Sequence, residues 1–313
     1  MNHYRAYGLH IRTALDLPEL TPIDPHSAVD IDVLCGVVDG PLPSSGPRLV
    51  QFGARSAYLA WPTIGKFRVE DRSTVIVDPL TDDPRRIRFA LLGPVLAAVL
   101  QLRRFPLLHG SAVEANGKAI VFVGRKGAGK STMAAASVAA GCGILNDDVL
   151  PFDSTADTMT LVPGFPALKL ESAMHRDLLP ALPVVGTPAQ TAAEKLFVSD
   201  GSRSPSNLPI GAVVVLQPDA LPRPVRLSPQ TALQELLPNG YMLKFAEAAL
   251  PNDQGPILFE ACARLARECS VLRLGRSAHR SELPEIVSAL MAECTGKSLT
   301  SALGRTEASH AWS

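Results

Sequence analysis

Hydrophobic and polar residues alternate over short segments in the first quarter of the chain. Residues 67–70 alternate apolar and charged side chains, which is typical of a half-buried strand. Residues 40–47 are rich in glycine, proline and serine and predict a loop. Other expected strands cover residues 31–34, 56–60 and 74–77. We therefore expect a small β-rich N-terminal domain over residues 1–82, with a packing or docking role rather than a chemical one.

The pattern becomes helical near residue 82. Residues 82–84, Asp-Asp-Pro, form a helix start, with an acidic cap followed by proline in the first turn. Apolar residues then recur at helical spacing, and Gly93 and Pro94 predict a bend. The apolar run over residues 89–102 is shorter than the roughly 20 residues of a membrane span, so it predicts a buried helix.

A glycine-rich loop follows the next predicted strand. Residues 119–123 are continuously apolar, as in a strand buried on both faces, and residues 133–140 are alanine-rich and helical. Between them, residues 124–131 fit the P-loop pattern G-x-x-x-x-G-K-S. In such a loop backbone N–H groups face phosphate oxygens, Lys130 reaches the β and γ phosphates, and the Ser131 hydroxyl ligates magnesium. We expect ATP and Mg²⁺ as cofactors. The predicted nucleotide-binding residues are Gly124, Arg125, Lys126, Gly127, Ala128, Gly129, Lys130, Ser131 and Thr132.

Two carboxylates and a histidine occur near this loop in the sequence. Asp147 and Asp148 follow a short apolar strand predicted at residues 143–145. One carboxylate of such a pair can hold Mg²⁺, and the other can take a proton from an attacking hydroxyl. A hairpin between residues 111–115 and the P-loop strand would bring His109 level with the loop. A catalytic or phosphate-facing role for His109 competes with a purely structural one.

The remaining sequence adds weaker candidates. Lys169 and Lys195 stand out because lysine is scarce, and either could contact phosphate or substrate rather than solvent. Residues 199–209 predict a mobile loop, and residues 296–313 predict a disordered tail. Turns and short strands are expected over residues 150–200, strands at 212–216 and 271–274, and helices near 229–237, 256–269 and 282–293.

Charge and cysteine content exclude several classes of protein. Lys plus Arg and Asp plus Glu are both 30, so the formal net charge is zero and predicts neither nucleic-acid nor membrane binding. The five cysteines are odd in number and include no Cys-x-x-Cys pair, so neither a disulfide framework nor a zinc site is expected. The N-terminus lacks the pattern of a signal peptide, and we expect a cytoplasmic protein.

The order of these motifs resembles the HPr kinase/phosphorylase superfamily. It resembles more closely the shorter HPr-kinase-like serine kinases of bacteria, some of which phosphorylate lasso-peptide precursors. The resemblance rests on LLHGSAV, GRKGAGKST, LNDD and PGFPALKL, in this order, and spans roughly residues 4 to 275. It implies an α/β (α+β) fold, in which residues 83–295 form a P-loop kinase domain of the HPr kinase or phosphoenolpyruvate-carboxykinase type.

The resemblance also implies roles for individual residues. Asp147 would be the general base, Asp148 a magnesium ligand, and His109 a neighbour of the transferred phosphate. With Lys130 as a further catalytic residue, we expect an ATP- and Mg²⁺-dependent serine kinase. Its substrate would be a peptide or small protein, such as a lasso-peptide precursor. A small-molecule kinase and a non-catalytic nucleotide-binding regulator are the alternatives. A homo-oligomer is compatible with the sequence, which defines no interface.

Overall fold

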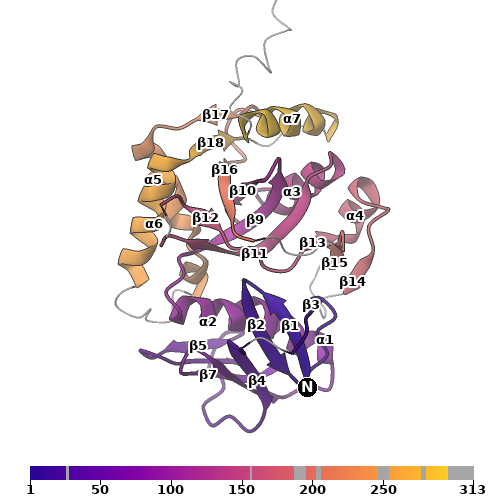
Figure 1. Ribbon diagram of the computed structural model, residues 1–313, viewed down its shortest axis with the longest axis vertical. Helices are drawn as coiled ribbons and strands as arrows, with labels where there is room; N and C mark the ends of the chain where they lie inside the picture. The colour runs from indigo at the N-terminus through magenta and orange to yellow at the C-terminus, as the bar shows by residue number, and fades with distance from the viewer. Residues whose placement is uncertain are drawn as a thin grey trace, which may run out of the picture.

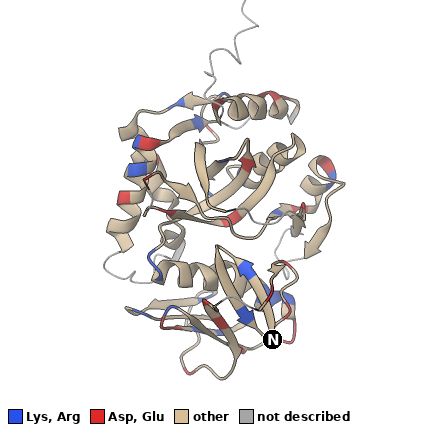
Figure 2. Ribbon diagram, viewed as in Figure 1, with Lys and Arg blue, Asp and Glu red and all other residues tan. Residues whose placement is uncertain are grey.

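The protein has a mixed α/β fold with two large sheets (Figure 1). The computed structural model describes residues 1–25, 28–155, 157–186, 195–201, 206–245, 254–275 and 280–294. Part of the predicted mobile loop, residues 202–205, and the predicted tail, residues 296–313, lie outside the described residues. Lysine, arginine and acidic residues are interspersed over both sheets, as Figure 2 shows. None of the helices in the described ranges is long and apolar enough to cross a membrane.

The first sheet has eight strands in the order β3-β1-β2-β4-β8-β7-β6-β5. The strands predicted in this part of the chain are all present. In β7, buried and partly exposed residues alternate, because one face of the strand packs on the core. The boundary predicted at residue 82 stays a prediction. The strands are β1 (Asn2–Ala6), β2 (Leu9–Thr13), β3 (Thr21–Pro22), β4 (Ile31–Cys35), β5 (Leu49–Phe52), β6 (Ala57–Trp61), β7 (Gly65–Glu70) and β8 (Thr74–Pro79).

A helix packs on this sheet and carries a bulge. Asp83 caps its start by accepting a hydrogen bond from the Arg85 backbone N–H at 3.0 Å. The helix consists of α1 (Pro84–Ala90), a π-helical turn (Leu91–Val95) and α2 (Leu96–Leu102). Pro94 has no N–H to donate to the preceding turn, which explains why the predicted bend takes the form of a wider turn. The helix shares one buried apolar cluster with the first sheet.

The second sheet curls until it closes on itself. Its order is β10-β9-β11-β12-β16-β18-β17, and β10 also pairs in parallel with β16. β9, β10, β16, β12 and β11 therefore form a continuous ring. These strands are β9 (Leu107–Ala115), β10 (Lys118–Gly124), β11 (Gly143–Asp153), β12 (Thr160–Leu161), β16 (Leu208–Leu216), β17 (Val225–Arg226) and β18 (Ser270–Leu274).

Helices cover this sheet through two separate apolar clusters. One cluster contains residues of α3 (Lys130–Ala139) and α7 (Leu283–Cys294). The other contains residues of α5 (Pro229–Leu236) and α6 (Gln254–Glu268). A small third sheet, with α4 (Ser172–Leu178) beside it, consists of β13 (Ala167–Glu171), β15 (Lys195–Ser199) and β14 (Val184–Gly186). The three helices and two strands predicted after residue 210 are thus present, with shifted ends.

The strand that carries the paired aspartates differs from the prediction. It was expected to end at residue 145, but β11 continues to Asp153. Asp147 and Asp148 therefore lie within a strand rather than after it. The polar side chains do not end the strand because the backbone of β11 keeps its pairing with β9 up to Pro151, through an irregularity between Ile144 and Asn146.

Candidate active site

The predicted phosphate loop connects β10 to α3. The hairpin of β9 and β10 has the predicted register, and Val123 pairs with Gly110 at its open end. Gly124 ends β10 with φ at 148°, in a conformation that L side chains rarely adopt. A Cβ atom there would lie 2.6 Å from the backbone oxygen of Leu216 in β16. The loop can therefore leave the strand on this path only with glycine. Helix α3 begins at Lys130 rather than at residue 133 as predicted.

The Lys130 side chain points into the loop. Its Nζ donates hydrogen bonds to the backbone oxygens of Gly124 at 2.9 Å and Arg125 at 3.2 Å. The residue is only 9% exposed, and burial lowers the pKa of its ammonium group. The charges of Asp147 and Asp148 oppose that effect. To contact a phosphate, the Lys130 ammonium must give up its hydrogen bonds to these two carbonyls of the loop.

Asp147 is held by donors from three elements. The Ser111 hydroxyl of β9 donates to Asp147 Oδ1 at 2.6 Å, and the Lys169 backbone N–H of β13 donates to Oδ2 at 2.8 Å. The Ser131 hydroxyl, in the first turn of α3, lies 3.5 Å from Oδ1. Burial raises the pKa of Asp147, and the hydrogen bonds from Ser111 and Lys169 lower it. The carboxylate thus lies beside the hydroxyl that a P-loop offers to magnesium.

Asp148 has a different set of neighbours. Its φ is +76°, which a non-glycine residue seldom adopts. Nδ1 of His109 lies 3.0 Å from both the backbone oxygen and Oδ1 of Asp148. The ring of Tyr241 lies 6.2 Å from that of His109, measured between centroids. Burial, followed by the charge of Asp148, raises the pKa of Tyr241 well above its usual value. A Cβ on Gly93, in the π-helical turn, would lie 3.9 Å from Asp148 Oδ2.

The first sheet reaches the site through Tyr7. This residue sits in the turn between β1 and β2 with φ at +55° and is buried. Its ring meets that of Phe165 edge to face at 6.5 Å, and leaves no room for a Cβ on Gly164. Burial raises the pKa of Tyr7, and the charges of Asp148 and Asp147 raise it further. Residues from both large sheets therefore surround the aspartate pair.

Both candidate lysines of the third sheet lie near the site. Lys169 Nζ lies 3.9 Å above the ring of Phe89 in α1. Burial lowers the pKa of Lys169, and the charge of Lys195 lowers it further. Lys195 also lowers the pKa of Lys130, so the three ammonium groups are within electrostatic reach of one another. Arg125 and Lys126 are exposed at the tip of the loop.

Asn146 holds the segment around the aspartates. Its side-chain Nδ2 donates to the backbone oxygens of Val149 and Val162, both at 3.2 Å, and its Oδ1 accepts from the Gly164 N–H at 3.0 Å. The site residues that sequence reasoning did not single out are Tyr7, Ser111, Asn146 and Tyr241. Two of them, Ser111 and Asn146, belong to the motifs LLHGSAV and LNDD, which could have drawn attention to them.

The oxygen atoms around the loop suit Mg²⁺ that is also bound by phosphate and water, rather than a metal ion bound by protein side chains alone. No cluster of three or more His, Cys, Asp or Glu that could hold a metal ion occurs among the described residues. Mg²⁺ typically uses one or two carboxylates together with phosphate oxygens and water. The Ser131 hydroxyl and the Asp147 carboxylate are donors of this kind, 3.5 Å apart.

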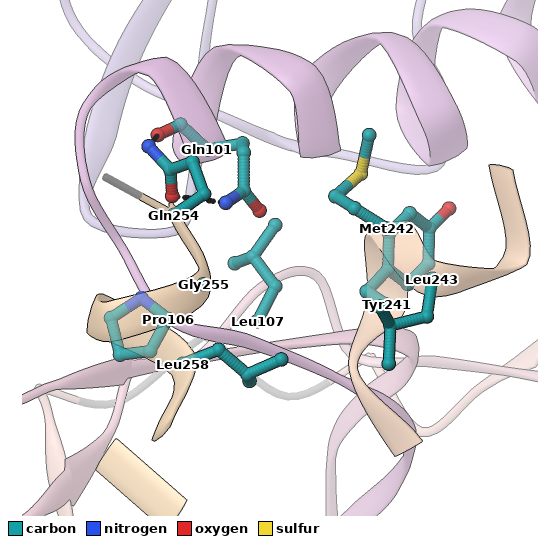
Figure 3. Close-up of a pocket in the computed structure, with 9 residues that line it drawn as sticks. All are labelled: Gln101, Pro106, Leu107, Tyr241, Met242, Leu243, Gln254, Gly255 and Leu258. Atoms are coloured by element: carbon teal, nitrogen blue, oxygen red, sulfur yellow. Dashed lines mark hydrogen bonds between the residues drawn. The ribbon is translucent and has the colours of Figure 1, made fainter. Parts of the chain in front are cut away.

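A small cavity adjoins the Tyr241 side of the site (Figure 3). Its volume is about 50 Å³, enough for water and too small for a nucleotide. Figure 3 shows Tyr241 and Met242 on one side of it and Gln101 and Gln254 on the other. The Gln101 side-chain amide donates to Gln254 Oε1, and the Gln254 amide donates to the Gln101 backbone oxygen. A larger groove, about 490 Å³, lies by the end of β11 and α6, and none of the candidate site residues lines it.

Comparisons with known proteins add little to this geometry. No protein-family model matches the sequence, and no curated protein matches it. One similar solved structure is the HPr(Ser) kinase/phosphatase from Coxiella burnetii, with a TM-score of 0.34 and 10% sequence identity. The alignment covers 61% of this chain and 91% of that one. Similarity at this level establishes neither a shared fold nor a shared activity, so function is argued from the site.

Proposed function

We propose that this protein is an ATP- and magnesium-dependent kinase that transfers the γ-phosphoryl group to a serine hydroxyl of a peptide or small protein. The observation that carries the proposal is the position of Asp147, whose Oδ1 lies 3.5 Å from the Ser131 hydroxyl of the loop. A phosphate loop alone suffices for nucleotide binding. Phosphoryl transfer also needs carboxylates for the metal and the acceptor proton, and Asp147 and Asp148 lie beside the loop.

Each group of residues in the site would have its own role. Backbone N–H groups of the loop and the N-terminus of α3 would bind the phosphates, with Lys130 supplying positive charge. Oxygen atoms of Ser131 and of the aspartate pair would hold Mg²⁺, which neutralises phosphate charge and orients the reacting groups when bound. Lys169 and Lys195 would add positive charge on the side of the third sheet.

The acceptor class rests on the sequence resemblance. A peptide is proposed because the motifs resemble serine kinases that act on peptides or small proteins, and a lasso-peptide precursor is the preferred example. A small-molecule kinase would use the same residues with another acceptor. A non-catalytic nucleotide-binding regulator would have no use for a second carboxylate beside the loop.

Intact-mass analysis of serine-containing peptides tests the proposal. After incubation with the protein, ATP and Mg²⁺, one peptide class is expected to gain the mass of a phosphoryl group. Lys130→Ala should abolish the gain. Lys118→Ala is the matched control, because Lys118 is exposed at the start of β10, at the end of that strand away from the loop, and it should keep full activity. Full transfer by Lys130→Ala would contradict the site. ATP binding without transfer to any peptide would favour one of the two alternatives.

A further inference from the structure

We propose that Lys169 binds the γ-phosphate of ATP and that Phe89, in α1, holds the Lys169 ammonium group in position for this contact. Lys169 thereby makes the site prefer ATP over ADP, and the N-terminal part of the chain takes part in nucleotide recognition. This inference rests on the nucleotide site of the proposed function. It differs from the expectation from the sequence, in which residues 1–82 and the elements packed on them have no chemical role.

The two faces of the third sheet pack against different apolar clusters. Leu168 and Leu170 belong to the cluster that contains α3. Ala167 belongs to the cluster of the first sheet, and Phe197 packs against that cluster. Lys169 pairs directly with Phe197 across β13 and β15, and directly opposed residues point to the same face of a sheet. The Lys169 side chain therefore lies on the face that is turned toward the first sheet and its helix.

Phe89 is the residue that the Lys169 ammonium group contacts on this face. Nζ lies over the Phe89 ring, 3.9 Å from its centroid, where the electrons of the ring attract a cation. In the part of the chain that the structure describes, this ammonium group makes no hydrogen bond or ion pair. A ring occupies one side of the ammonium group, and the N–H groups on the other side can donate to phosphate oxygens.

The helix that carries Phe89 also faces the aspartate pair. Gly93 follows Phe89 by four residues, and residues at this spacing are neighbours on one side of a helix. A Cβ on Gly93 would lie 3.9 Å from Asp148 Oδ2. Beside Phe89 in the sequence, Arg88 forms an ion pair with Glu19 at 2.9 Å, with side chains only 15% and 4% exposed. This buried pair ties the helix to the segment between β2 and β3, and it fixes the Phe89 ring beside the site.

The charges of the site support a place for Lys169 near the end of the phosphate chain. Burial lowers the pKa of Lys169, and the largest charge that opposes this effect is that of Asp148. Burial also lowers the pKa of Lys130 in the loop, where the largest opposing charge is that of Asp147. The two ammonium groups thus act from different sides of the aspartate pair. A phosphate chain that is held by the loop and extends along the aspartates would end near Lys169.

An ammonium group in this place distinguishes nucleotides by the number of their phosphates. ADP ends one phosphate before ATP, so ADP would not reach Lys169. A hydrogen bond between an ammonium group and a phosphate joins two charged groups and is about twice as strong as a bond between neutral ones. The contact is lost when the γ-phosphoryl group is transferred, so the product ADP should bind more weakly than ATP.

Binding of ADP and of the non-hydrolysable ATP analogue AMP-PNP, each with Mg²⁺, tests the inference by isothermal titration calorimetry. The wild-type protein should bind AMP-PNP more tightly than ADP. Lys169→Met keeps an apolar stem and removes the charge. It should weaken AMP-PNP binding about 10-fold or more and ADP binding by less than about 2-fold. Lys118→Met is the matched control, because Lys118 is exposed at the start of β10, away from the loop, and it should match the wild-type protein with both nucleotides.

Two variants of Phe89 test whether the ring acts through Lys169. Phe89→Leu removes the ring but keeps a large apolar side chain, and it should weaken AMP-PNP binding about 3-fold or more without a similar loss for ADP. Phe89→Tyr keeps the ring and should retain the wild-type preference. In a Lys169→Met background, Phe89→Leu should not change the ratio of the two dissociation constants further. Far-UV circular dichroism and urea midpoints check that each variant folds, and Lys169→Met carries the test if Phe89→Leu does not.

The outcomes separate this inference from the proposed function. If Lys169→Met weakens both nucleotides equally, or weakens neither, the role of Lys169 is overturned and the kinase function stands. If Phe89→Leu still lowers the preference for AMP-PNP in the Lys169→Met background, the positioning role of Phe89 is overturned. If the wild-type protein prefers AMP-PNP through Lys169 but phosphorylates no acceptor, the kinase proposal fails and the γ-phosphate contact stands. If it binds neither nucleotide, both fail.

Discussion

Replacing Asn146 by alanine should destabilise the protein by about 3 kcal/mol. The side chain is buried and makes three hydrogen bonds to the backbone, to Val149, Val162 and Gly164. Each such bond contributes about 1 kcal/mol net, and the loss is larger where the abandoned partner stays buried. Asn146→Ala removes all three at once and leaves no replacement donor or acceptor.

Urea denaturation followed by circular dichroism measures this loss. The matched control is Asn207→Ala, because Asn207 is exposed and its side chain donates one hydrogen bond within the described part of the chain, to Asp153 at 3.3 Å. The control should change the free energy of unfolding by less than about 0.5 kcal/mol. A loss below about 1 kcal/mol in Asn146→Ala would refute the reasoning, since it would mean that the amide does not hold the segment next to the aspartates.

Two further predictions concern the loop and the first sheet. Gly124→Ala should cost about 1 to 3 kcal/mol and abolish ATP binding, because its Cβ would meet the backbone of Leu216 at 2.6 Å. Gly127→Ala carries the strain of a positive φ, +82°, but no atom lies within 4 Å of its Cβ, so it should cost less stability. Urea midpoints compare the stability of the two variants, and ATP titration checks Gly124→Ala. Equal losses of stability would contradict the steric argument. In the first sheet, burial and the adjacent His10 ring lower the pKa of His3 below its value near 6.5 in an unfolded chain. The unfolded state therefore binds more protons below about pH 6.5, and stability falls as the pH drops through that range. Between about pH 7.5 and 5.5 the wild-type Tm should fall more than that of His3→Gln, and an equal fall would refute the effect.

The parts of the site that local chemistry determines could be predicted from the sequence. The β10 strand, the glycine turn and the start of α3 depend on apolar runs and on backbone conformations that the residues themselves dictate. The β9–β10 hairpin follows from Asn116 and Gly117, both of which adopt positive φ. The helix after residue 83 and its bend follow in the same way from an acidic cap and from Pro94.

The rest depends on contacts between residues far apart in the chain. Tyr7 and Tyr241 approach Asp148 only because the β1–β2 turn packs on Phe165 and the segment after α5 packs against β9. No local pattern marks either tyrosine. The full length of β11 depends on its pairing with β9. The polar Asn-Asp-Asp segment in β11 does not have the pattern of a strand, so the sequence did not predict this length. The surroundings of Asp147 depend on donors such as Ser111, whose contact is set by strand register.

A crystal structure of the protein with Mg²⁺ and a non-hydrolysable ATP analogue would decide whether this loop is a nucleotide site. Phosphate oxygens should lie within hydrogen-bond distance of the N–H groups of residues 125–131. The Lys130 ammonium should have exchanged the Gly124 and Arg125 oxygens for a phosphate, and the metal should lie between Ser131 and Asp147. A nucleotide bound elsewhere, with Lys130 still hydrogen-bonded to the loop carbonyls, would contradict the nucleotide site on which the proposed function depends.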